Sequence, residues 1–125
     1  MFTSYTSVYI RRMTHYLISF PSEAMVIAAD DFDAVVTDSH QVVREIKDAG
    51  IYVFGGGINE DVPPVMVAGD GTVTEGTYAS TRELRGGFMV VNTPSRDVAL
   101  HWAARIAVAC RCAQEVREFG FDPES

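Results

Sequence analysis

Two apolar spacings alternate along residues 14–119, and their order constrains the fold more than any other feature of the chain. Residues 14–20 alternate strictly between two faces before Pro21 ends the run, which predicts a strand. Residues 32–46 instead place apolar side chains every three or four positions up to Gly50, which predicts an amphipathic helix. The chain is therefore expected to combine strands and helices.

The middle of the chain predicts three further short strands. Residues 51–54 form a buried-type run that enters the glycines at 55–57, where a bend or the close approach of another group is expected. Residues 65–68 and 72–74 flank a Gly-Asp-Gly turn at 69–71, and Asp-Gly between β-prone runs is a hairpin signal.

The last part of the chain predicts a strand at 88–91, a helix and a final strand at 113–119. Pro94 and Ser95 open this helix, and Trp102 lies on its apolar face, where it is expected to belong to the core. The predicted elements follow the order strand, helix, strand, hairpin, strand, helix, strand. With right-handed crossovers, this order places the helices on one face of a largely antiparallel sheet. The predicted class is therefore α+β, with the form of a ferredoxin-like sandwich.

The second face of such a sheet has no helices of its own to cover it. It must be solvated or buried against a second copy of the chain. The first strand carries apolar residues on both faces, with Tyr16, Ile18 and Phe20 on one and Leu17 on the other. We therefore expect a homodimer.

Length and charge narrow the function classes. With 125 residues the chain fits one domain, expected at 13–120 between an N-terminal extension, 1–12, and a tail, 121–125. The extension is rich in Thr, Ser and Tyr, and predicts an edge strand or a loose tail. A net charge of −7 argues against nucleic acid as a partner. Without an apolar run that spans a bilayer or a secretory signal, no membrane partner and a cytoplasmic location are expected.

The sequence predicts neither a disulfide nor a metal site. Cys110 and Cys112, read as strand residues, point the same way and are too far apart to bridge easily, so free and at least half-buried thiols are expected. No histidine lies at the spacing of a zinc motif. The acidic cluster at 30–33 stands where it would cap the first helix, so no cofactor or metal is inferred from it or from Glu60-Asp61.

Residues 74–88, TEGTYASTRELRGGF, resemble the signature of the DGPF branch of the YCII-related family, which typically reads TDGPFAETKEQLGGF. The match has no gaps. Residues 99–106, which end in WAARI, and residues 115–117 are similar to the family's last helix and last strand. The signature Asp, Pro, Phe and Glu are replaced here by Glu75, Thr77, Tyr78 and Ser80, so the chain resembles a divergent member.

The resemblance implies a dimeric α+β barrel and little about chemistry. In YCII-type relatives a His on the first helix and an Asp near the signature are suspected of acid–base work in a cleft at the sheet. Such a protein would be a cofactor-free enzyme of the lyase, isomerase or dehalogenating type, acting on a small polar organic molecule. The alternative is a non-catalytic ligand-binding or regulatory module, since family members are often associated with sigma-factor-like regulators.

The resemblance places Glu75 as the acid or base, with His15 or His40 as its proton partner. Counting back from Gly50 puts Ser39 where the family His usually falls, within the apolar stripe formed by Phe32, Val36, Val43 and Ile46. His40 is turned by about 100° to the margin of that stripe, where a structural boundary histidine is the favoured reading. His15 lines a cleft or stands in water at the end of the sheet.

Tyr78 and Arg82 are candidates to orient an anionic or carbonyl-bearing ligand, together with Ser39. The alternative is that the signature loop only braces a dimer. Glycines 76, 86 and 87 are expected to serve backbone geometry rather than phosphate binding, because no strand-loop-helix unit surrounds them. His101 and Arg105 are expected on a solvated or subunit-contact face.

Overall fold

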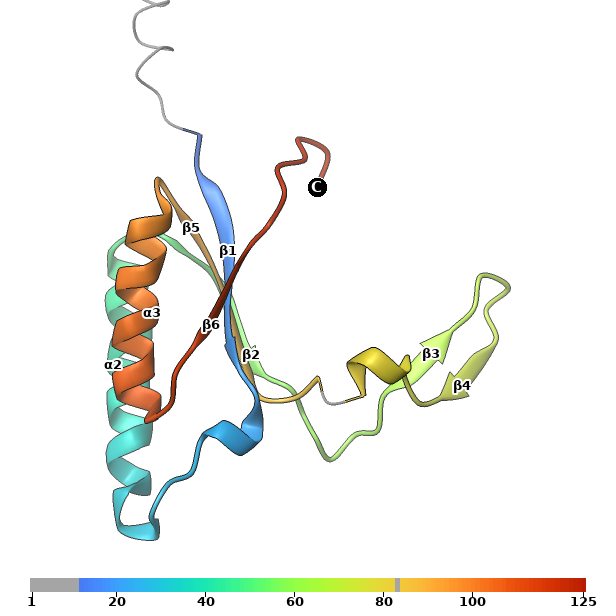
Figure 1. Cartoon of the computed structure of the whole chain (residues 1–125), viewed down its shortest axis with the longest axis horizontal. Helices are drawn as coiled ribbons and strands as arrows, with labels where there is room; N and C mark the ends of the chain where they lie inside the picture. The colour runs from blue at the N-terminus through green and yellow to red at the C-terminus, as the bar shows by residue number, and fades with distance from the viewer. Residues whose placement is uncertain (1–11, 83) are drawn as a thin grey trace, which may run out of the picture.

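A computed structural model of the chain describes residues 12–82 and 84–125, so the edge strand or loose tail expected at 1–12 lies almost wholly outside the described residues. The described part has a four-stranded sheet, two α-helices on one face of it, and a separate two-stranded arm (Figure 1). Among these residues, neither helix has the length and apolar character needed to cross a membrane.

All neighbouring strands of the main sheet are antiparallel, and their order is β2-β5-β1-β6. The four strands are β1 (Thr14–Phe20), β2 (Tyr52–Gly57), β5 (Gly87–Thr93) and β6 (Glu115–Glu118). With the arm set aside, the chain runs strand-helix-strand-strand-helix-strand, the order that a ferredoxin-like sandwich requires. The α+β class and the helices on one face agree with the sequence prediction.

The register of the central strands separates the two faces of the sheet. Ile18 of β1 lies opposite Met89 of β5, and both side chains point toward the helices and are buried. Leu17 stands opposite Val90 and Arg117 on the other face. We call this second side, which carries no helix in Figure 1, the open face.

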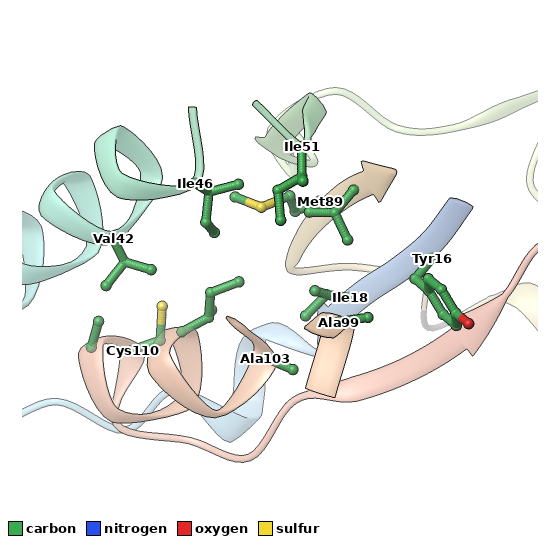
Figure 2. Close-up of a cluster of buried hydrophobic side chains, with 12 residues drawn as sticks. Tyr16, Ile18, Val42, Ile46, Ile51, Met89, Ala99, Ala103 and Cys110 are labelled. Carbon is green, nitrogen blue, oxygen red and sulfur yellow. The ribbon is translucent and has the colours of Figure 1, made fainter. Parts of the chain in front are cut away.

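Helices α2 (Phe32–Asp48) and α3 (Arg96–Cys110) pack on the sheet and on each other. Figure 2 shows Val42 and Ile46 of α2 facing Ala103 and Cys110 of α3 across the core. Ile46 has no exposed surface, and truncating such a side chain to Ala typically costs about 2–5 kcal/mol. The two helices and the sheet therefore share one hydrophobic core.

The buried stripe of α2 agrees with the prediction except at the beginning of the helix. Val35, Val42 and Ile46 are buried with Ser39 between them, whereas Phe32 and Val36 are exposed. Phe32 stands at the first turn, beyond the end of the surface that α3 and the sheet cover. Four of the apolar residues predicted for this helix are therefore buried or partly buried, namely Val35, Val42, Val43 and Ile46.

The predicted beginning of α3 is confirmed, whereas the predicted cap of α2 is wrong. The helix α3 begins just after Pro94 and Ser95, as predicted, and Ser95 caps it by accepting a hydrogen bond from the Val98 N–H at 3.3 Å. Asp31 makes no such cap on α2, because its carboxylate bonds to Arg111 instead. Cys110 is the last residue of α3 and Cys112 lies in the turn beyond it, so the expectation that both lie on a strand is wrong. Both are free, with Cys110 buried and Cys112 partly so, as expected.

The predicted hairpin forms, but outside the main sheet. Strands β3 (Val65–Val67) and β4 (Val73–Glu75) pair only with each other, and the Asp70 carboxylate accepts from the Thr72 N–H at 2.9 Å in the turn. Pro63 and Pro64 precede β3 and have no N–H to offer a neighbouring strand, which favours this separation. Figure 1 shows the hairpin projecting from the body; we call residues 62–78 the arm.

Candidate functional site

The three residues predicted for acid–base chemistry lie on different parts of the protomer. Glu75 ends β4 on the arm and is exposed. His15 is exposed on the open face, and His40 is exposed on α2. The boundary reading of His40 agrees with this position. One protomer by itself does not bring the three groups together, and their catalytic roles stay predictions.

The two predicted orienting residues also stand apart. Tyr78 is 71% exposed at the base of the arm, and Arg82 is exposed after the short 3-10 helix η3 (Ala79–Thr81). Neither lines the cavity described next. Ser39, in contrast, lies where the sequence placed it, on the buried side of α2.

Ser39 lines a cavity of about 150 Å³ between the helices and the sheet, which we call the helix-layer cavity. Ile106, Ala109 and Cys110 of α3 form another wall, and Met89 of β5 contributes from the sheet. Because a serine rather than an aliphatic residue occupies the centre of the α2 stripe, the core does not close completely at this point.

Two side chains bring polar atoms to the lining. The Ser39 hydroxyl donates to the Val36 carbonyl oxygen at 3.1 Å. Nε2 of Gln114 donates to the Cys112 carbonyl oxygen at 3.2 Å, which leaves the amide oxygen of Gln114 as an acceptor. The cavity is therefore apolar with a few hydrogen-bonding groups in its lining.

The thiol of Cys110 also lines the helix-layer cavity. Burial raises the pKa of this thiol, and the nearby Cys112 raises it further. The thiol is therefore protonated at neutral pH and is a poor nucleophile. Among the described residues that line the cavity, none is Asp, Glu, His, Lys or Arg.

The glycines of the signature act through backbone geometry, as predicted. Gly86 has φ of 107°, and a Cβ there would collide with the carbonyl oxygen of Phe20. A Cβ on Gly87 would lie 2.6 Å from Cε1 of the Phe20 ring. The two glycines therefore let β5 pass close to the end of β1, where Phe20 and Gly87 line the cavity.

The sequence analysis missed Ala109, Cys110 and Gln114 as lining residues. The spacing of Ala103, Ile106 and Cys110 on the inner side of α3 was the signal available, but Cys110 was read as a strand residue. Gln114 follows the helix in a turn, and no periodic pattern indicates where such a side chain lies.

These features define a two-layer α+β protein with an apolar cavity between its layers. Residues 13–119 match the YCII-related domain, and the chain belongs to that family. A comparison with curated proteins finds no match.

Proposed function

We propose that the protein is a homodimeric member of the DGPF branch that binds a small organic molecule in the helix-layer cavity without transforming it. The composition of that cavity carries the proposal. It holds Ser39, the residue at the family's helix position, but its described lining offers no side chain suited to general acid or base work near neutral pH. Binding is the function that such a lining supports.

The size and polarity of the cavity suggest the class of ligand. An apolar cavity of about 150 Å³ takes a benzene-sized molecule. The amide oxygen of Gln114 and the Ser39 hydroxyl supply acceptors for one donor group. A neutral ring with one hydroxyl, as in phenol, combines these properties.

Nuclear magnetic resonance titration with phenol tests this function. We expect phenol to perturb Ile106 and Cys110 in the natural protein. Ala109→Leu should abolish the perturbation, because its larger side chain fills the cavity. Val108→Leu is the matched control, since Val108 is 76% exposed on the same helix. Equal binding by the two variants, or shifts confined to another surface, would contradict the proposal.

Over-packing costs about 1–3 kcal/mol, so a second variant guards against an unfolded Ala109→Leu protein. Ser39→Val also narrows the cavity and keeps α2 in register. Loss of phenol binding in a folded Ser39→Val protein supports the same conclusion, and unchanged binding would overturn it.

Two apolar surfaces support the homodimer. Phe54, on the open face, is 68% exposed. On the arm, Val65, Val67 and Val73 are each more than half exposed, although a two-stranded hairpin is marginally stable by itself. A second copy that covers the arm and the β2 side of the open face, where Phe54 lies, would remove this apolar surface from water. Any acid–base role for Glu75 with His15 would need such a dimer, because the two lie on separate surfaces of one protomer.

Analytical ultracentrifugation of Phe54→Glu tests the dimer. We expect this charge on the open face to shift the protein toward monomer. Val108→Glu places the same charge on the outer side of α3 and should leave the dimer intact. A monomeric natural protein, or equal behaviour of both variants, would refute the open face as the interface.

A further inference from the structure

A hollow distinct from the helix-layer cavity lies on the open face at the end of β1, and different polar groups line it. We call it the open-face hollow; it has a volume of about 340 Å³, at the small end of the range for ligand sites. Leu17 and Ser19 of β1 and Arg117 of β6 line it from the sheet, and Leu84 and Arg85 line it from the loop before β5.

The hollow carries two guanidinium groups in a chain whose net charge is −7. They belong to Arg85 and Arg117, and each contacts one glutamate, Glu23 and Glu115 respectively. Exposed ion pairs of this kind contribute little, so the carboxylate of a small ligand can compete with Glu115 for Arg117.

The Arg117 guanidinium is held only weakly. It contacts the Glu115 carboxylate at 3.3 Å, and the two side chains are 60% and 58% exposed. Exposed pairs of this geometry contribute about 0–1 kcal/mol. The planar fork of Arg117 can therefore turn to a ligand carboxylate and bind it through two donors.

Arg85 stands across the hollow on the loop. Its Nη2 lies 3.3 Å from the Glu23 carboxylate, and both side chains are substantially exposed. This contact holds the guanidinium beside the hollow without burying it. Arg85 therefore adds a second guanidinium group to the wall of the hollow, with its charge offset by Glu23.

Ser19 places a hydroxyl on the sheet side of the hollow. The residue is only 4% exposed, and no hydrogen bond to its hydroxyl is made within residues 12–82 and 84–125. Because Ser19 lines the hollow, its hydroxyl can donate to a ligand oxygen there.

The rest of the lining is apolar. Leu17, Phe20, Pro21, Leu84 and Phe88 surround the polar groups. We propose that the open-face hollow binds a small organic carboxylate with an apolar body, with its carboxylate toward Arg117 and Ser19 and its body against Phe88 and Leu84. This goes beyond the proposed function, because the ligand is charged and the polar groups lie on the other side of the sheet.

Isothermal titration calorimetry with benzoate and benzamide tests this proposal. Benzamide has the same shape without the charge and should bind at least roughly tenfold more weakly. Arg117→Gln should weaken benzoate by a similar factor, and Ser19→Ala by several-fold. Arg44→Gln removes the same charge from the exposed side of α2 and should change nothing. Ala109→Leu should retain benzoate binding, which separates this hollow from the helix-layer cavity.

Equal binding of benzoate and benzamide, or an equal effect of Arg117→Gln and Arg44→Gln, would overturn the proposal.

A carboxylate could also come from an acidic side chain of a second copy. In that case benzoate would not bind, and Arg117→Gln would weaken self-association in ultracentrifugation; that result would also overturn the small-ligand proposal. Arg117→Lys keeps the charge without the fork and guards against loss of folding, and it should bind benzoate with intermediate affinity.

Discussion

The guanidinium group of Arg111 donates two parallel hydrogen bonds, of 3.0 and 3.2 Å, to the carboxylate of Asp31. Arg111 follows the end of α3, and Asp31 precedes the beginning of α2. Its Nη1 reaches the Asp38 carboxylate at 3.1 Å and the Ala109 carbonyl oxygen at 2.9 Å. One guanidinium therefore joins the end of one helix to the beginning of the other and caps α3. The two carboxylates raise the pKa of Arg111, so it stays charged throughout the range in which the protein is folded.

Replacement of Arg111 by Lys should destabilise the protein by about 1–3 kcal/mol, because an ammonium group cannot reproduce the two parallel bonds. Urea unfolding measures the change. Arg44→Lys is the control, since Arg44 bonds only to Gln41 on its own helix among the described residues. If the two substitutions have equal effects, the Arg111 cluster does not stabilise the helix layer.

Replacement of Gly86 by Ala should destabilise the protein by more than about 2 kcal/mol, since it combines backbone strain with a collision against the Phe20 carbonyl. Gly69→Ala is the matched control, because a Cβ at Gly69 meets nothing within 4 Å and its φ is ordinary. Thermal unfolding of the two variants checks this. Similar melting temperatures would show that the loop before β5 yields to the added methyl group.

Local patterns predicted most of the fold because they depend on neighbouring residues. Alternation over 14–20 gave the bounds of β1 correctly, and Pro94 and Ser95 were correctly placed at the beginning of α3. Gly86 and Gly87 were also correctly assigned to backbone geometry, because no strand-loop-helix unit that could bind a phosphate surrounds them. These signals are local in the chain.

The parts that failed depend on distant contacts. Asp31 has the residue type and position of a helix cap, but Arg111, 80 positions away, takes its carboxylate. No periodicity reveals such a pair. The hairpin at 65–75 was recognised, but its separation from the main sheet depends on competition between strands. The open-face hollow was missed because Ser19 and Arg117 come to the same surface only through the pairing of β1 with β6.

Glu45 should make stability depend on pH. Hydrogen bonds from Gln41 and then Arg105 lower the pKa of its carboxyl below the ordinary value of 4.5. A folded-state pKa below the unfolded one adds stability above about pH 4.5, which is lost as the pH falls through the lower value. Glu45→Gln should therefore flatten the decline in melting temperature between about pH 5 and about pH 3. Glu124→Gln, in the tail, is the control, and an unchanged slope in Glu45→Gln would contradict the role.

The two thiols should differ in reactivity. Burial raises the pKa of both Cys110 and Cys112, and Cys110 is the more deeply buried residue. Because the thiolate is the reactive form, a disulfide reagent should modify Cys112 slowly at neutral pH and Cys110 more slowly still. Rates measured on Cys110→Ser and Cys112→Ser assign each phase.

Phenol in the helix-layer cavity should slow only the Cys110 phase, since that thiol lines the cavity. Fast modification of Cys110 in the folded protein would show that the cavity is open to solvent. A Cys110 rate that phenol does not change would show that phenol does not bind in the cavity.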